Sequence, residues 1–169
     1  MRFEKVSYDQ FAADMEKWMP EMSKMLYKRF YDRVTLPKRQ TAGSAGYDFV
    51  TPVRIMLEPG QQAVIPSGIR AVFSDEERET WHLEVFVRSS IGLKKGGILP
   101  NSVAIIDADY FQGENGGDIL LALKNTSRKI IDIAPAERIC QGIFKIHGLT
   151  SDDDAEGHRS GGVGSTGKQ

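Results

Sequence analysis

The amino-acid sequence predicts an all-β domain, and three observations lead to that fold class. Short stretches in which every second residue is apolar recur between residues 34 and 146, the periodicity of half-buried strands. Turn-forming residues such as Pro59 and Gly60 separate these stretches. No long helical pattern lies between them, which argues against β–α–β units. Together these features are typical of a β-sandwich or barrel built from many short strands.

The expected strands follow one another along the chain. The alternation is clearest where Trp81, Leu83, Val85 and Val87 are apolar. The full set of expected strands comprises residues 53–57, 69–73, 81–87, 119–123, 130–133 and 139–146.

The first 33 residues predict helix instead. Ser7 and Gln10 have the spacing of a capping box, and Val6 with Phe11 fits a hydrophobic staple. An apolar stripe follows at helical spacing, formed by Phe11, Met15, Trp18, Met22 and Met25. Pro20 interrupts it, so we expect either a kink or a second helix with Pro20 in its first turn. We interpret the stripe as packing against the body or a neighbouring subunit, in preference to a cofactor role. The expected domains are thus a helical extension (1–33), a core (34–148) and a flexible C-terminal arm (149–169).

The C-terminal arm has an unusual composition. Residues 151–156 hold four acids, and residues 161–167 hold four glycines that favour disorder in the free chain. Successive glycine N–H groups can also converge on an anion, and Arg159, Ser165 and Thr166 add phosphate-binding donors. Composition alone leaves both a solvated linker and an anion-binding segment open.

Charge and cysteine content exclude several classes of protein. The chain has 22 Lys and Arg against 23 Asp and Glu, so no overall field attracts DNA, RNA or anionic lipid. Cys140 is the single cysteine, which rules out an intramolecular disulfide and favours a reducing compartment, the cytoplasm. No apolar stretch approaches the roughly 20 residues of a membrane span, and no signal-peptide core is present.

Two segments carry groups suited to phosphate chemistry. Arg88, Ser89 and Ser90 end a predicted strand and precede a glycine-bearing turn, which predicts a polyphosphate cradle or, equally, an ordinary charged loop. Asp107 directly follows an apolar stretch, a position that can hold a general base at the edge of buried surface, and Tyr110 offers a flat face. The alternative for this second segment is a turn whose acids cap backbone groups.

Two further segments are less specific. The small residues around Gly46 permit a close backbone approach just before Asp48, or simply form a bulge. Gln141 lies in an apolar strand and needs a buried partner from the protein or a ligand. We interpret the adjacent Cys140 as a packed thiol and not as a nucleophile.

The five segments, in this order, resemble the signature motifs of the homotrimeric dUTPase family. They read AGYDF, VRSSIGLKKG, NSVAIIDADY, ERICQGIF and RSGGVGSTG, and the resemblance extends from about Val34 to the C-terminus. It implies a distorted, β-clip-like jelly-roll barrel, a homotrimer with three active sites at subunit junctions, and an arm that closes over a neighbour's site. It further implies hydrolysis of dUTP to dUMP and pyrophosphate with Mg²⁺, which keeps uracil out of DNA and supplies dUMP for dTMP synthesis.

The resemblance also implies a role for each matching residue. Asp107 would activate the attacking water, and Tyr110 would pack under the deoxyribose and exclude a 2′-hydroxyl. Asp48 would hold the water shell of the metal. The implied uracil contacts are Asn101, Ile106 and Val163, and the implied phosphate contacts are Arg88, Ser89, Ser90, Gln141, Arg159, Gly164, Ser165 and Thr166.

This sequence departs from the family pattern in three places. Val163 stands where the family usually has a phenylalanine stacked on uracil, which bears on how tightly the arm captures the base. Ser90-Ile91 and Val87 are smaller departures in the second motif.

Two alternatives to a dUTPase stay open. One is a dCTP deaminase of the same fold, although residues 110–113 lack the glutamate that this family uses. The other is a dUTPase scaffold that serves as a regulatory binding protein.

Overall fold

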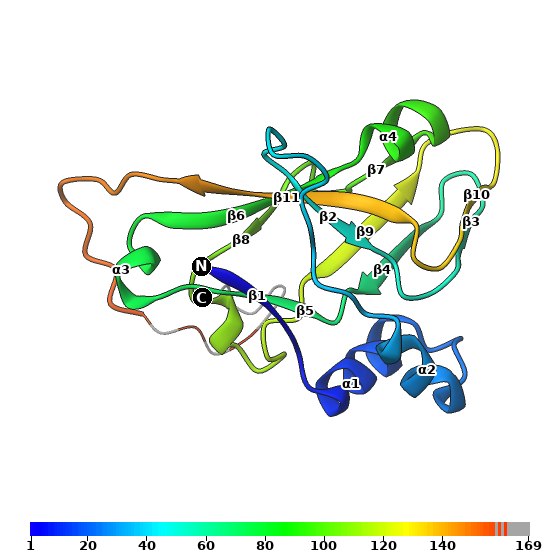
Figure 1. Cartoon of the computed structure of the whole chain (residues 1–169), viewed down its shortest axis with the longest axis horizontal. Helices are drawn as coiled ribbons and strands as arrows, with labels where there is room; N and C mark the ends of the chain where they lie inside the picture. Colours follow the sequence, from blue (N-terminus) through cyan, green and yellow to red (C-terminus); the bar gives the residue numbers. More distant parts are fainter. Residues whose placement is uncertain (158, 160, 162–169) are drawn as a thin grey trace.

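The computed structural model describes residues 1–157, 159 and 161. In this part of the chain short strands dominate, and the few helices are confined to the N-terminal region and to connections (Figure 1). The expectation of an all-β fold is therefore confirmed.

The largest sheet has four strands in the order β2-β11-β6-β8. These are β2 (Tyr47–Val50), β11 (Arg138–Ile146), β6 (Trp81–Val87) and β8 (Ala104–Ile106), and all neighbours are antiparallel. Leu83 and Val85 of β6 are fully buried, as the alternation predicts.

Smaller sheets complete the body. β4 (Gln62–Pro66), β9 (Leu120–Asn125) and β7 (Gly97–Ile98) form a three-stranded sheet, and β3 (Ile55–Leu57) pairs with β10 (Ile131–Ile133). The core lies between these layers, with Ile65, Leu121 and Leu123 buried on one side and Phe49, Leu83 and Ile139 on the other.

The N-terminal region contains a strand that the sequence pattern did not predict. β1 (Arg2–Lys5) pairs with β5 (Ile69–Val72), and the Phe3 ring lies 5.5 Å from that of Phe49, at their centroids. A four-residue edge strand of mostly polar residues gives little periodic signal, which is why it was missed.

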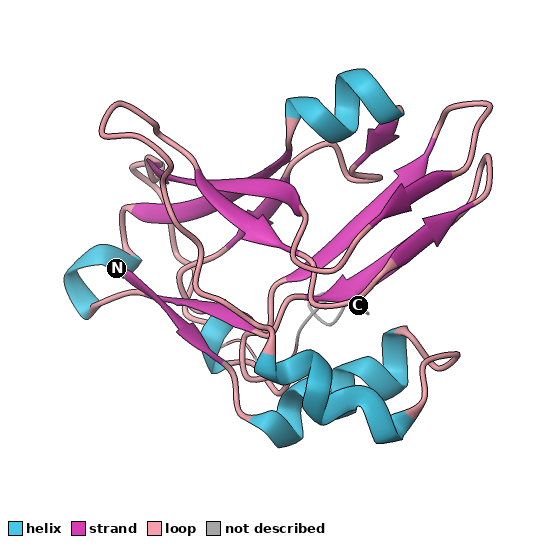
Figure 2. Cartoon of the chain, turned by 45° about the vertical axis from the view of Figure 1, so that its right-hand side comes forward, coloured by secondary structure: helices cyan, strands magenta, loops and turns pink. Residues whose placement is uncertain are grey.

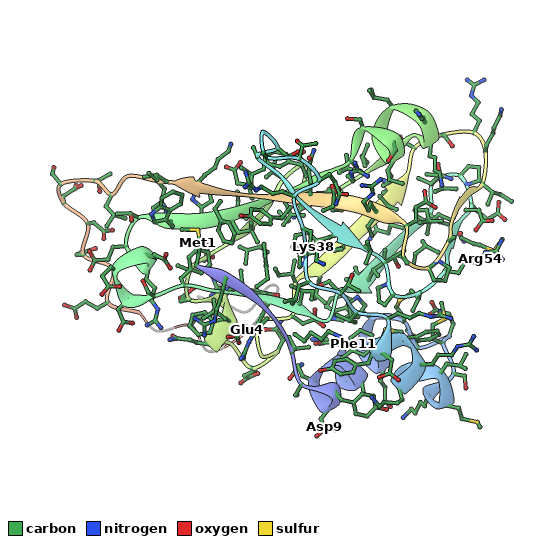
Figure 3. The ribbon with its side chains drawn as sticks, viewed as in Figure 1. Met1, Glu4, Asp9, Phe11, Lys38 and Arg54 are labelled. Carbon is green, nitrogen blue, oxygen red and sulfur yellow. The ribbon has the colours of Figure 1, made fainter. Side chains whose placement is uncertain are left out.

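Helix α1 (Tyr8–Trp18) follows β1 and is capped by Ser7, whose hydroxyl accepts from the Gln10 N–H at 3.1 Å. The capping box is incomplete because the Gln10 side chain donates to Asp14 instead. Phe11 and Met15 are fully buried under the strands, and Figure 3 shows Phe11 on the side of the helix opposite Asp9.

Pro20 neither kinks a helix nor begins one, so both expectations for it are wrong. α1 ends at Trp18, and the chain turns before the 3₁₀ helix η1 (Lys24–Leu26) and helix α2 (Tyr27–Asp32). The apolar stripe therefore ends early, and Met25 is 92% exposed. Figure 2 shows these helices together beneath the strands.

The other helices connect strands. They are α3 (Asp75–Arg78), α4 (Ser89–Lys95) and the 3₁₀ helix η2 (Tyr110–Gln112). α4 replaces the turn expected after Arg88: Gly92 is tolerated within it, and Gly96, with a φ of 72°, ends it. No helix in the described part of the chain is long and apolar enough to cross a membrane.

Candidate active site

Asp107 occupies the edge of the buried surface, as expected. Strand β8 ends at the buried Ile106, and the next residue turns its carboxylate outward, 54% exposed. The Asp107 carbonyl accepts from the Tyr110 N–H at 3.0 Å, which begins helix η2. The backbone is thus fixed while the carboxylate remains accessible, the arrangement that a base acting on water requires.

Arg159 reaches this carboxylate from the C-terminal arm of the same chain. Its guanidinium ion-pairs with Asp107 and also with Asp109, at 2.9 Å from Nε to Oδ1. The guanidinium carbon lies 5.5 Å from the centre of the Tyr110 ring. Arg159 thus contacts two carboxylates of its own chain, whereas the resemblance implies a neighbour's site. The arm's place on a neighbour remains a prediction.

Tyr110 is buried and its hydroxyl is fully engaged. It donates to the Asp118 carbonyl at 3.1 Å and accepts from Asn115 Nδ2 at 2.8 Å. Burial, above all, raises the pKa of the Tyr110 hydroxyl. The ring is therefore a fixed, neutral surface beside Asp107.

Asp48 lies in β2 in a second cluster, and its carboxylate is 7% exposed. One oxygen forms an ion pair with Arg88 Nε at 2.9 Å, and the other accepts from Arg138 Nη1 at 3.4 Å. Arg88 precedes the first turn of α4, where Ser89 and Ser90 lie. This cluster is rich in donors for phosphate.

Gln141 lies beside Asp48, its partner in the register between β11 and β2. Its side chain is half-buried and passes close to Gly46, where an added Cβ would lie 2.7 Å from the amide oxygen. Within the described residues the amide makes no hydrogen bond to another protein group. Of the two partners expected for it, a protein group or a ligand, the protein group is absent from this part of the chain.

The chain does not bring these two clusters together. In the antiparallel register of β8 and β6, Ile106 pairs with Leu83, which places Asp107 opposite His82, near the start of β6. Arg88 directly follows the other end of β6. At about 3.3 Å per residue, the positions of His82 and Arg88 along the strand lie about 20 Å apart. A single chain therefore holds two halves of the predicted site at opposite ends of one strand.

The remaining predicted residues are distributed as follows. Asn101 is exposed in the turn between β7 and β8, next to Ser102, which has a φ of 62°. Val163, Gly164, Ser165 and Thr166 lie outside the described residues.

A cavity of about 670 Å³ adjoins Asp107, which is within the range of small-molecule sites. Residues from three separate parts of the chain line it, among them Arg78, His82, Asp109 and His147.

The structure assigns contacts to residues that the sequence did not single out. Arg138 shares Asp48 with Arg88, and Asp109 shares Arg159 with Asp107. Both are charged residues inside the quoted motif segments, and this is the signal that could have identified them. Asn115 and Asp118 support Tyr110, and nothing in the sequence pattern pointed to them.

Cys140 is a packed thiol. It is buried, and burial raises its pKa to about 12. The thiolate needed for nucleophilic attack is therefore suppressed.

Known proteins resemble this chain over most of its length. The family model for dUTPase matches residues 32–167. The deoxyuridine 5'-triphosphate nucleotidohydrolase of Lactococcus lactis subsp. lactis is 35% identical over 137 residues, covering 79% of this chain and 89% of the relative. The protein of the same name from Escherichia coli is 32% identical over 153 residues, covering 86% of this chain and 96% of the relative.

Solved structures of dUTPases also resemble this chain in fold. A dUTPase from Streptococcus mutans superposes with a TM-score of 0.67 and 29% identity, covering 89% of this chain and 99% of its own. A dUTPase from phage phi11 of S. aureus, whose structure concerns a structural Mg(II) ion, gives a TM-score of 0.60 at 17% identity, covering 76% and 94%. The expected dUTPase jelly-roll fold is thereby confirmed. Since the family match spans most of the sequence and relatives above 30% identity align along nearly their whole length, the chain belongs to the dUTPase family.

Proposed function

We propose that this protein hydrolyses dUTP to dUMP and pyrophosphate. The observation that carries the proposal is the position of Asp107, an accessible carboxylate at the end of a buried strand, beside the fixed ring of Tyr110. The family and the names of its relatives support the same substrate. The reaction removes a precursor of uracil in DNA and supplies dUMP.

Asp107 acts as the general base in this proposal. It takes a proton from a water that attacks the α-phosphorus, and the bond from that phosphorus to the bridging oxygen breaks as pyrophosphate leaves. Arg159 ion-pairs with Asp107 in the chain, so it releases the carboxylate when its guanidinium turns to a phosphate. Substrate binding then frees the base at the moment it is needed.

The cluster around Asp48 binds the phosphates. Arg88 supplies a planar donor fork whose Nε is fixed by Asp48. Ser89, Ser90 and Gln141 add hydroxyl and amide donors nearby. Oriented donors of this kind stabilise the charge that develops on the phosphoryl oxygens.

Nucleoside recognition belongs to the hairpin that carries Asp107. Asn101 and Ile106 contact the uracil, and Tyr110 packs under the deoxyribose. In the arm, Val163 covers the base while Gly164, Ser165 and Thr166 join Arg159 at the terminal phosphate.

Mg²⁺ is the proposed cofactor. The described residues contain no group of three acidic, His or Cys side chains that could hold a metal alone, which fits an ion shared with a triphosphate that keeps part of its water shell. Bound there, Mg²⁺ would neutralise phosphate charge. Asp48 Oδ2, only loosely contacted by Arg138 at 3.4 Å, is the oxygen available to a metal-bound water.

We also propose a homotrimer, because the Asp107 and Arg88 clusters lie at opposite ends of β6 and need separate chains to meet.

The proposed compartment of the protein is the cytoplasm, because a single, buried cysteine such as Cys140 suits a reducing environment.

Pyrophosphate release tests the proposed function directly. Purified protein with Mg²⁺ is given dUTP, dTTP, dCTP and UTP in parallel, and ammonia release from dCTP is measured alongside. We expect pyrophosphate from dUTP well above the other three and no ammonia. Ammonia from dCTP would identify a deaminase instead, and no turnover of dUTP would reject catalysis.

A further inference from the structure

Two buried carboxyl groups meet between helix α1 and the start of β9. Asp14 is 4% exposed on α1, and Asp118, two residues before β9, is 0% exposed. The two carboxyl groups lie close enough to affect each other's pKa, and neither forms an ion pair with a cation in the described part of the chain. Buried carboxylates normally have a cation as partner, whereas these two have one another.

The hydrogen bonds around the pair leave room for one proton. Asp118 Oδ1 accepts from the Gly68 N–H at 2.8 Å and from the Ser67 hydroxyl at 3.2 Å. Asp14 Oδ2 accepts from Gln10 Nε2 at 3.0 Å. Asp118 Oδ2 has no donor among the described residues. An ionised carboxyl group cannot donate, so a contact between the two groups becomes a hydrogen bond only when one of them is protonated.

Electrostatics favours the same protonation. Burial raises the pKa of both carboxyl groups, and the proximity of Asp14 raises that of Asp118 further. The charge of Lys17 lowers the pKa of Asp14, but it only partly offsets the effect of burial. The Ser67 hydroxyl and the N–H groups of Gly68 and Ile69 face Asp118 from the other side. Two like charges in this space are costly, and one shared proton removes that cost.

The pair is joined to the nucleotide site through Tyr110. The carbonyl of Asp118 accepts from the Tyr110 hydroxyl. Asn115 Nδ2 donates to both, at 2.8 Å to the Tyr110 hydroxyl and 3.2 Å to the Asp118 carbonyl. Gln10 of α1 also packs against Gly116 in the same loop. Helix α1 thus holds the segment that fixes the ring.

We propose that Asp14 and Asp118 share one proton and act as positioning residues for Tyr110, so that helix α1 helps the site distinguish deoxyribose from ribose. The positioning role rests on the proposed function of Tyr110 as the surface under the sugar. The shared proton depends only on the folded chain.

Stability as a function of pH tests the shared proton. A group whose pKa is raised by folding stabilises the protein below its ordinary value of 3.8, and this stabilisation is lost as pH rises towards the raised pKa. In Asp14→Asn the amide donates to Asp118 without titrating. Urea unfolding at one protein concentration should show that wild type loses stability relative to Asp14→Asn as the pH rises above the ordinary pKa of 3.8. The limit for one proton is about tenfold in the folding equilibrium constant per pH unit.

Asp9→Asn is the matched control for this measurement, because Asp9 is exposed on the same helix (Figure 3). It should follow the wild-type pH dependence. Parallel curves for wild type and Asp14→Asn would overturn the shared proton, and no nucleotide is needed for this result.

Sugar selectivity tests the positioning role. Asp14→Ala removes the contact, and the ratio of kcat/KM for dUTP over UTP should fall roughly three- to tenfold, the range for one net hydrogen bond. Asp14→Asn should restore much of the ratio. An unchanged ratio in Asp14→Ala would overturn this role.

If Asp14→Ala does not fold, Asp118→Asn replaces it. The amide at position 118 would keep an acceptor for the Gly68 N–H and donate to Asp14. The stability of Asp118→Asn should therefore depend less on pH than that of wild type, and its preference for dUTP over UTP should be kept. Failure of either result counts against the proposal. A wild-type protein without dUTP turnover would reject the proposed function together with the positioning role, while the unfolding measurements would still decide the shared proton.

Discussion

At the scale of single residues, chemistry depends on how each side chain is held. Asp107 and Asp118 are both aspartates near a strand end, yet one is accessible and the other is fully buried. The first is available to water, and the second shares its environment with another acid. The same residue type therefore serves two different purposes within one turn region.

Asp107→Asn should abolish most turnover. The substitution preserves the shape of the side chain but removes its ability to accept a proton, so we expect kcat to fall roughly 10²–10⁴-fold. Binding of a non-hydrolysable dUTP analogue, measured by calorimetry, should change little. If the variant turns over dUTP at a near-normal rate, Asp107 is not the base.

The sequence singled out candidate residues for the site but not the partners that hold them. Asp107, Arg88 and Asp48 stood in recognisable motifs, each flanked by an apolar stretch or by glycines. That Asp48 would lie between Arg88 and Arg138 depended on the antiparallel register of β2 and β11. Asn115 and Asp118 were invisible because their contacts with Tyr110 arise from tertiary folding of a loop.

At the scale of elements, strong periodicity predicted structure well and weak periodicity did not. β6 alternates, β11 is a long and largely apolar segment, and both are predicted from the sequence. β1 is short and mostly polar, β4 is short and ends in Pro66, and both form because neighbouring strands offer hydrogen bonds. Helix α4 was missed because Gly92 and Gly96 are turn signals when seen without their surroundings.

The N-terminal helix belongs to the same hydrophobic core as the strands, and Phe11→Ala tests this. Phe11 is fully buried, and replacing a buried phenylalanine by alanine costs about 3–5 kcal/mol. The free energy of unfolding, measured with urea, should fall by that amount.

Met25→Ala on the neighbouring 3₁₀ helix is the control, because this side chain is exposed; it should unfold like wild type. A Phe11→Ala protein as stable as this control would mean that residues 1–33 are a separate extension after all.

At the scale of the whole molecule, the division of the site between two ends of β6 makes a prediction about mixed oligomers. Asp107→Asn and Arg88→Ala should each be nearly inactive. After denaturation and joint refolding, trimers that contain both variants should form junctions where an intact Asp107 meets an intact Arg88. With random mixing of equal amounts in a cyclic trimer, about a quarter of all junctions are intact, and activity should recover to about that fraction.

A pair of variants at the same position provides the control. Asp107→Asn mixed with Asp107→Ala contains no intact base and should stay inactive. If the first mixture also stays inactive although mass spectrometry detects mixed trimers, then each chain builds its own site.

The central place of β11 in the four-stranded sheet also governs when this protein can fold during its synthesis. β11 lies between β2 and β6, yet it is made after both. On the ribosome, β2 must wait for about 96 further residues before residue 146 appears, or roughly 5–20 s at ordinary rates of translation. During that time the partner edges of β2 and β6 lack the strand that joins them. The four-stranded sheet can therefore close only after β11 has left the ribosome, and until then the apolar faces of β2 and β6 stay without their central partner strand.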